Sequence, residues 1–508
     1  MHFPRTLFSV VLSLSTSTVE AQAPPVSQQS TGFNSSFALS PSQIASANLS
    51  AELAARINTI VNFDRSQLAN GGPAEDSFYS LPPLTNTSSL KPGTILKVQE
   101  FTNTTSFVLP PNTALSRILY TTTNHNGTVI PASAFILWPF APKTFPQAQP
   151  QNQNQNNHAK APTILWAHGT SGFFASRSPS SHRALWYGDA APFALALAGY
   201  AVVAPDYAGL GISTSWDGSN IPHQYLLSSA SAHDALHALQ ASLAAFPGRL
   251  EERFVAMGHS QGGGVAWSVA EVLAADEETG VFADLAAGYL GAIAGSPTTR
   301  VFPSSSIAAL IAPWVSLALP SLFPSSFEPG MWLTPLGIAR TRLLREIEGG
   351  ISVSMQLFEE GEGARVVRED YYESTWHAEA YERIADAGGK RFKGPLVVLQ
   401  GTEDPYIPVE GTTRVVRETC AVSGNGSVDL EYVLVNGTTH VPTLYATRQV
   451  WLQWIEDRFA GRPLRKPGCG GATEIKSWLE LDRYQEVGNS FPMWAGAEEF
   501  TYQTPLGP

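Results

Sequence analysis

The strongest chemical signal in the sequence is a serine between two glycines, in Gly-His-Ser-Gln-Gly at 258–262. The apolar run before it, 253–257, predicts a strand, and the residues from Gly263 onward predict a helix. A serine on such a turn can be held in a strained backbone conformation, with the glycines leaving room for neighbouring segments. The amino terminus of the helix favours negative charge there. The pattern predicts that Ser260 is a nucleophile.

A serine hydroxyl needs a base to remove its proton, and the base needs an acid that orients it. Asp404 lies in the turn Gly-Thr-Glu-Asp-Pro that follows the apolar strand pattern at 396–400. His440 ends the loop Asn-Gly-Thr-Thr-His that follows the next strand pattern. We therefore predict His440 as the base and Asp404 as the acid that accepts its Nδ1–H. Glu403 and Glu410 are the competing acids.

A tetrahedral intermediate on the serine also needs two N–H donors for its oxyanion. Gln261, directly after the serine, is predicted to provide one of them. The second is expected from the loop His-Gly-Thr-Ser-Gly at 168–172, where glycines let the backbone approach an acyl oxygen. We predict Thr170 as that donor, with Ser171 as the alternative. Nearby, Asp206 and Tyr207 either support the floor of the site or form a structural turn.

These residues require a scaffold, and the sequence from 163 onward alternates short apolar runs with helical segments. The predicted strands are Thr163–Ala167, Ala201–Ala204, Phe254–Gly258, Gly288–Ala294, Leu396–Gln400 and Glu431–Val435. The predicted helices are Ala191–Ala198, Ser229–Ala245, Gln261–Ala275 and Thr443–Phe459. Such alternation predicts an α/β fold with a mainly parallel sheet covered by helices on both faces. Ahead of it, Ile95–Phe107 predicts an early strand, and the β-rich segments on either side of Asn126-Gly127 predict an antiparallel hairpin.

The alternation stops between 296 and 393, where no strand pattern is clear. The apolar stretch Ile307 to Phe327 is interrupted by prolines, so it is not a membrane span. We expect a helical cap inserted into the catalytic domain, a separate second domain being the alternative. The expected organisation is a signal peptide at 1–21, a lead segment at 22–93, core segments at 94–295 and 394–460, the cap at 296–393, and a strap or tail at 461–508. Within the lead segment, a short helix is expected from Pro41 to Asn58.

Taken together, these motifs resemble the secretory lipase family, the lipase A type of the α/β-hydrolase superfamily. The resemblance implies an α/β-hydrolase fold with a cap inserted after the strand that follows the nucleophile helix. It also implies Ser260, Asp404 and His440 as the triad, with Gln261 and Thr170 as oxyanion donors. The sequence departs from the family at His259 and Gln261, where secretory lipases often carry an aromatic residue and a glycine. That departure concerns the substrate rather than the class of reaction.

The first residues are typical of a secretory signal peptide. Arg5 supplies a positive charge, a short apolar stretch follows, and small residues precede a cleavage site that we place after Ala21. Seven N-glycosylation sequons agree with secretion, at Asn34, Asn48, Asn86, Asn103, Asn126, Asn425 and Asn436. In an oxidising compartment Cys420 and Cys469 are expected to form a disulfide, the alternative being two unrelated buried thiols.

The formal net charge of −12 argues against a nucleic-acid partner. No metal or cofactor is expected. A structural zinc in particular is not expected, since neither cysteine has a partner at metal-site spacing. The leading function is hydrolysis of a carboxylic ester through an acyl-enzyme, by a lipase or esterase that contacts a lipid interface transiently. The alternatives are an acyltransferase acting on a secondary metabolite, a secreted serine peptidase, and a binding module without activity. Acyl chain length, leaving group and oligomeric state stay open.

Overall fold

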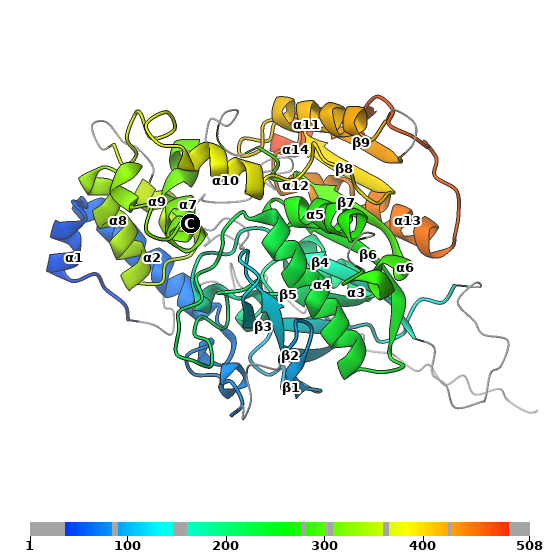
Figure 1. The fold of residues 1–508 in the computed structure, drawn as a ribbon, viewed down its shortest axis with the longest axis horizontal. Coiled ribbons are helices and arrows are strands. Elements are labelled where there is room, and N and C mark those ends of the chain that lie inside the picture. The colour runs from blue at the N-terminus through cyan, green and yellow to red at the C-terminus, as the bar shows by residue number, and fades with distance from the viewer. Residues whose placement is uncertain are drawn as a thin grey trace, which may run out of the picture.

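The centre of the molecule is a ten-stranded sheet, seen in a computed structural model that describes residues 36–83, 90–145, 160–276, 280–300, 302, 308–358, 365–424 and 428–486. The strand order is β1-β2-β3-β5-β4-β6-β7-β8-β9-β10 (Figure 1). The first strands, β1 (Ile95–Gln99), β2 (Ala114–Thr123) and β3 (Val129–Trp138), run antiparallel, and β3 pairs antiparallel with β5. Asn124 and Gly127 close the turn between β2 and β3, at the expected hairpin.

The rest of the sheet is parallel, which confirms the predicted fold class. Its strands are β4 (Ala161–Ala167), β5 (Ala201–Pro205), β6 (Leu250–His259), β7 (Tyr289–Gly295), β8 (Leu396–Gly401), β9 (Leu430–Val435) and β10 (Thr473–Ile475). Along β4, the buried side chains of Leu165 and Ala167 belong to one core cluster, while those of Ile164 and Trp166 belong to another. Both faces of the strand are therefore covered, which explains its continuous apolar sequence.

Helices cover the two faces of the sheet separately. One cluster joins the strands to α4 (Ser228–Ala245), α5 (Gln261–Ala275), α6 (Ala283–Gly288) and α11 (Val409–Val422). The opposite cluster joins them to α3 (Pro192–Leu197), α12 (Pro442–Ala446) and α13 (Arg448–Phe459).

The predicted single helix Thr443–Phe459 is wrong in one respect, because the chain breaks at Thr447 into α12 and α13. The predicted strand Ile95–Phe107 is also too long, since β1 ends at Gln99.

A separate helical layer lies beside the sheet, at the left of Figure 1. Its helices between β7 and β8 are α7 (Ala308–Leu322), α8 (Pro335–Glu346), α9 (Ile351–Phe358) and α10 (His377–Ala385). Helix α7 continues through Pro313 and Pro320, although we expected prolines to interrupt it. Buried side chains such as Val315 and Leu319 hold this helix against its neighbours, and burial on this scale outweighs the lost backbone hydrogen bonds.

The segment before the sheet also contributes to this layer. It forms α1 (Pro41–Ser46) and α2 (Ala51–Ser66) instead of one short helix. Ile57, Ile60 and Phe63 of α2 are buried in the same cluster as Leu344 and Leu357. Ser40 and Ser50 cap the two helices by accepting hydrogen bonds from backbone N–H groups in their first turns. The helical layer is therefore built from two stretches of chain far apart in the sequence.

The C-terminal region is attached to the edge of the sheet. Cys420 at the end of α11 forms a disulfide with Cys469, with 5.7 Å between their Cα atoms. Beyond Cys469, β10 pairs parallel with β9, and α14 (Leu481–Glu486) follows. Within the residues that the structure describes, no helix is long and apolar enough to cross a membrane. The expected signal peptide lies outside the described residues.

Candidate active site

Ser260 lies on the turn between β6 and α5, with φ 59° and ψ −122°. This left-handed region is costly for a residue with a side chain, so neighbouring contacts must hold it. The backbone N–H of Ser260 donates to Gly295 O at 2.9 Å, and its carbonyl accepts from Gly264 at 3.1 Å. The flanking glycines are required, because a Cβ on Gly258 would lie 2.0 Å from the carbonyl oxygen of Gly262.

His440 and Asp404 meet beside this turn, although 36 residues separate them in the sequence. His440 Nδ1 lies 2.7 Å from Asp404 Oδ2, and both side chains are buried. A carboxylate oxygen can only accept, so Nδ1 carries the proton and Nε2 is left as an acceptor. The competing acids Glu403 and Glu410 are exposed to solvent. Of the three carboxylates, Asp404 is the one in contact with His440.

The surroundings of Asp404 keep it ionised. Burial alone would raise its pKa, but His440 and the backbone N–H groups of Ile407 and Tyr406 outweigh burial and hold the pKa below its usual value. Those two N–H groups donate to Oδ1 at 2.9 and 3.0 Å. The amide of Gln400, at the end of β8, lies 3.4 Å from Oδ2 and donates to Ile407 O at 2.9 Å. Gln400 thereby connects the strand to the turn that carries Asp404.

The loop after β4 lies against the turn of Ser260. Thr170 is buried, and its hydroxyl lies 3.0 Å from the hydroxyl of Tyr225. Gln261 begins α5, where a backbone N–H has no acceptor within the helix. The side chain of Gln261 contacts a histidine: its Nε2 lies 3.2 Å from His223 Nε2. Burial lowers the pKa of His223 to about 4, so that this ring is neutral and accepts.

Asp206 and Tyr207 support this loop. Tyr207 donates to the carbonyl of His168 at 2.9 Å, and its ring stacks on the His168 ring with 4.2 Å between centroids. Asp206 accepts from Ser180 N at 2.7 Å and from the hydroxyl of Ser133. Burial raises the pKa of Asp206 to about 6. These contacts fix the carboxyl end of β5 beneath the 168–172 loop.

Ser260 and His440 share one pocket with Thr170. It encloses about 460 Å³, part of it open to solvent. The remaining lining is mostly apolar: Tyr225, Leu226, Thr298, Ile311, Trp314, Ile351, Met355, Tyr406 and Ile407. Ile311, Trp314, Ile351 and Met355 come from α7 and α9, so the helical layer forms one wall of the pocket. The arrangement can hold an apolar group against a serine hydroxyl and the imidazole of His440.

Sequence reasoning missed several residues that hold the site together. Tyr187 donates to His259 Nδ1 at 2.6 Å, and His259 Nε2 lies 3.1 Å from the carbonyl of His440. Gln400 and Tyr225 were missed as well, and the partner of Tyr225, Thr170, lies 55 residues away in the sequence. Only Gln400 carried a signal, as a polar residue ending an apolar strand. Within the described part of the chain, no group of three metal-ligating side chains comes together.

The comparisons with known proteins agree with this arrangement. Residues 164–451 match the model of the alpha/beta hydrolase family. No curated protein sequence is significantly similar. Among solved structures, Candida antarctica lipase A is 16% identical with a TM-score of 0.58, the match covering 86% of this chain and 98% of the lipase. The rice cell wall degrading esterase LipA from Xanthomonas oryzae is 16% identical with a TM-score of 0.53, covering 72% of this chain and 98% of the esterase.

Identities this low establish a common fold, and the fold is that of lipase A, as the motifs suggested. The match to the family model spans more than half of the chain and includes Ser260, Asp404 and His440. On that match, and on the parallel sheet that carries these three residues, the chain belongs to the alpha/beta hydrolase family.

Proposed function

We propose that this protein hydrolyses carboxylic esters through a covalent acyl-enzyme on Ser260. The observation that carries the proposal is the contact of 2.7 Å between His440 Nδ1 and Asp404 Oδ2, on a histidine that shares an apolar pocket with Ser260. The contact leaves Nε2 of His440 as the atom that can accept a proton. Esterase and lipase folds among the structural neighbours agree with this class of reaction.

The proposed reaction has two halves. Ser260 Oγ attacks the carbonyl carbon while His440 Nε2 takes the hydroxyl proton, and the backbone N–H groups of Gln261 and Thr170 stabilise the oxyanion. The alcohol leaves with the proton from His440, and the acyl group stays on the serine. Water then attacks the carbonyl of the acyl-enzyme and gives up a proton to His440, which passes it to Ser260 Oγ as the carboxylic acid is released. Asp404 stays ionised throughout and stabilises the imidazolium.

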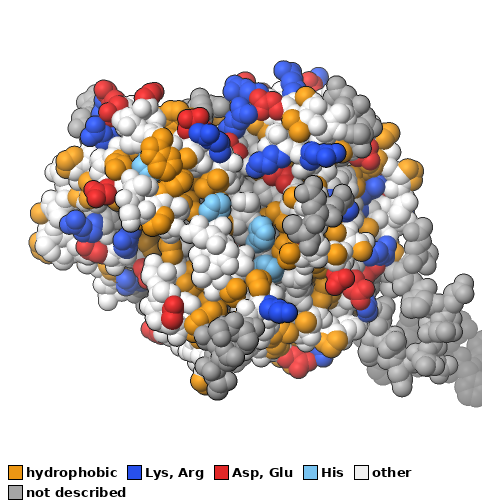
Figure 2. All heavy atoms as spheres, viewed as in Figure 1, with side chains coloured by type: hydrophobic (Ala, Val, Ile, Leu, Met, Phe, Trp, Pro, Cys, Tyr) orange, Lys and Arg blue, Asp and Glu red, His pale blue; other side chains and the backbone are white. Residues whose placement is uncertain are grey.

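The acyl chain belongs in the apolar pocket beside Ser260. Ile311 and Trp314 of α7 and Met355 of α9 line it, and hydrocarbon favours such a surface over water. The helical layer also presents apolar surface to solvent, including Trp376, which is 56% exposed. On the face drawn in Figure 2, hydrophobic side chains gather over this layer, whereas charged side chains of both signs are scattered. Transient contact with a lipid interface through this layer is part of the proposal.

We also propose that the protein is secreted and glycosylated. Four sequon asparagines lie among the described residues, Asn48, Asn103, Asn126 and Asn436, and all are exposed. The others, Asn34, Asn86 and Asn425, lie outside the described residues. The disulfide between Cys420 and Cys469 agrees with an oxidising compartment. Mass measurement of the secreted protein before and after removal of N-glycans tests this, and an intracellular, unglycosylated product would contradict it.

The test of ester hydrolysis is release of p-nitrophenol from short-chain and long-chain acyl esters by the wild type and by Ser260→Ala. We expect turnover in the wild type, its loss in the variant, and a serine-bound acyl group detectable by mass spectrometry. Glu403→Gln is the control. It removes an exposed carboxylate that follows β8, two strands along the sheet from β6, which carries Ser260. Transfer of the acyl group to an added alcohol or amine in preference to water would instead identify an acyltransferase.

A further inference from the structure

Tyr225 lies between the helical layer and the 168–172 loop, and its side chain is held from several sides. It is 3% exposed. Its ring lies edge-on to the ring of Phe173, with 5.0 Å between centroids, and 6.0 Å from the ring of Trp314 on α7. Its backbone carbonyl accepts from the hydroxyl of Tyr381 on α10 at 2.6 Å. These contacts fix the phenol beside the loop.

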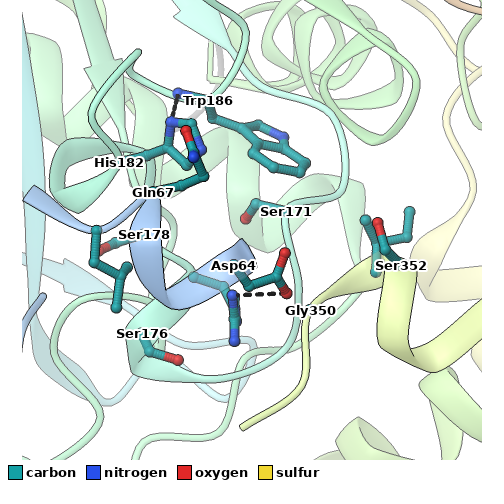
Figure 3. A pocket seen from close by; sticks show the side chains of 12 residues that line it. Asp64, Gln67, Ser171, Ser176, Ser178, His182, Trp186, Gly350 and Ser352 are labelled. Atoms are coloured by element: carbon teal, nitrogen blue, oxygen red, sulfur yellow. Dashed lines mark hydrogen bonds and ion pairs between the residues drawn. The ribbon is translucent and has the colours of Figure 1, made fainter. Parts of the chain in front are cut away.

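The loop is anchored on both sides of Thr170. Before this residue, Trp186 Nε1 donates to the carbonyl of Gly169 at 3.2 Å. After it, Gly172 forms an antiparallel bridge with Gly350. Trp186 and Gly350 line a second pocket, which Figure 3 draws. The backbone at Thr170 is therefore held in place, and its hydroxyl is the part that is left to orient.

The hydroxyls of Tyr225 and Thr170 lie 3.0 Å apart and form one hydrogen bond with each other, in which either oxygen can be the donor. Among the described residues neither hydroxyl has a second hydrogen-bond partner. The pair carries two protons and the bond between them uses one, so one O–H is left as a donor without an acceptor. Buried hydroxyls are normally satisfied, and both residues line the pocket of Ser260. The remaining donor therefore indicates an acceptor that forms during the reaction.

This donor lies beside the place where the oxyanion forms in the proposed reaction. Oγ1 and the backbone N of one threonine are separated by three bonds, which puts them about 3–4 Å apart in any staggered rotamer. Because the backbone N–H of Thr170 is one of the proposed oxyanion donors, its hydroxyl borders the same position. None of the described residues that line the pocket is a carboxylate that would compete for the proton. Burial raises the pKa of Tyr225 well above its usual value, so the phenol stays protonated.

We propose that Tyr225 is a positioning residue of the oxyanion site, which donates to Thr170 Oγ1 and thereby directs the hydroxyl proton of Thr170 to the oxyanion. The hydroxyl of Thr170 is then a third donor beside the two backbone N–H groups. A phenol is more acidic than an aliphatic hydroxyl and is the better donor, which sets the order of the two bonds. In such a chain the first bond polarises the second. The inference rests on the proposed ester hydrolysis.

The test measures kcat and KM on p-nitrophenyl butyrate for three variants. Thr170→Val keeps the shape of the side chain and the backbone N–H but removes the hydroxyl, and we expect kcat to fall about 10²-fold with KM within about twofold of wild type. Thr170→Ser keeps the hydroxyl and should retain most of the kcat. Tyr225→Phe leaves that hydroxyl without its partner, and we expect kcat to fall about five- to tenfold. A larger loss of kcat in Tyr225→Phe than in Thr170→Val overturns the proposed order.

Two further variants separate positioning from a loss of packing. The two side chains act in one chain of hydrogen bonds, so Thr170→Val/Tyr225→Phe should have the kcat of Thr170→Val alone, and additive losses overturn the proposal. Tyr120→Phe is the matched control, because it removes another buried phenol with one hydrogen bond, of 2.9 Å to the carbonyl of Asp234. It should leave kcat unchanged. Equal losses of kcat in Tyr225→Phe and Tyr120→Phe overturn the positioning role.

A second measurement does not depend on turnover. When 1,1,1-trifluorohexan-2-one adds to the protein, Ser260 Oγ bonds to the carbonyl carbon, its proton passes to His440, and the carbonyl oxygen becomes an oxyanion. We expect the affinity for this ketone, measured by fluorine NMR, to fall about fivefold in Tyr225→Phe and to be unchanged in Tyr120→Phe. Equal affinities of wild type and Tyr225→Phe overturn this inference alone where the wild type hydrolyses esters. Wild-type protein that forms the adduct but hydrolyses no ester contradicts the proposed ester hydrolysis alone.

Discussion

The phenol of Tyr187 lies 2.6 Å from Nδ1 of His259, on one side of a buried imidazole ring. On the other side of the ring, Nε2 lies 3.1 Å from the backbone carbonyl of His440. A carbonyl can only accept, so Nε2 donates and Nδ1 accepts from Tyr187. Burial and the neighbouring His440 lower the pKa of His259 well below its usual value, so the ring stays neutral. His259 therefore connects the turn of Ser260 to the loop of the proposed base.

This connection predicts a role for His259 in positioning His440. His259→Leu removes the donor to the carbonyl of His440, and we expect kcat on p-nitrophenyl butyrate to fall about five- to tenfold, with KM unchanged. His259→Gln keeps an N–H donor on a side chain of similar reach and should retain most of the activity. His237→Leu, at another buried histidine on α4, is the control and should leave kcat unchanged. A rise in KM without a fall in kcat would contradict the positioning role.

A second prediction concerns the acid that orients His440. Asp404→Asn keeps the size of the side chain but replaces an accepting oxygen with a group that can donate to Nδ1, which favours the wrong tautomer. We expect kcat to fall by about 10³–10⁴-fold, as in other serine hydrolases with this change. Glu403→Gln, at the exposed neighbouring acid, should stay within about twofold of wild type. Comparable losses of kcat in both variants would mean that activity depends on the turn as a whole rather than on the Asp404 carboxylate.

The sequence predicted the parts of this protein that depend on short stretches of chain. The turn of Ser260, and the turns after β8 and β9 that carry Asp404 and His440, each follow an apolar strand. Parallel strands bring their carboxyl ends to one edge of a sheet, so the proximity of these residues followed from order alone. Their catalytic roles are still predictions.

Other features depend on contacts between distant segments, which local patterns do not encode. Tyr187 lies in a stretch of turns and short 3₁₀ helices with no periodic pattern, yet it contacts His259, 72 residues away. One short helix from Pro41 to Asn58 was expected where the chain forms α1 and α2, because the local sequence does not show that Ile57 packs against residues near 350. The break between α12 and α13 at Thr447 was not predicted either, since the apolar pattern continues from α12 into α13. Tertiary packing decides all three features.

A third prediction concerns acyl chain length. Met355 on α9 lines the pocket of Ser260, so Met355→Ala enlarges the space proposed for the acyl chain. We expect kcat/KM for p-nitrophenyl laurate relative to the butyrate ester to rise about three- to tenfold, since additional methylene groups can then be buried. Met331→Ala, at a half-buried methionine of the helical layer outside that lining, is the control. An unchanged chain-length profile in Met355→Ala would mean that the acyl chain lies elsewhere.

A fourth prediction concerns the pH dependence of stability. Burial, reinforced by Glu382, raises the pKa of Asp386 to about 8, although Lys390 and Arg300 oppose the shift, and its Oδ1 is buried without a partner. The unfolded chain ionises this group near pH 4, so its ionisation destabilises the fold progressively from about pH 4 to pH 8. Asp386→Asn removes that penalty, and the free energy of unfolding in urea should rise on the order of 2 kcal/mol above wild type at pH 8.5, with no gain at pH 3.5. Glu403→Gln, at an exposed site, should show no such difference, and a gain for Asp386→Asn that is equal at both pH values would show that the charge of Asp386 is not its cause.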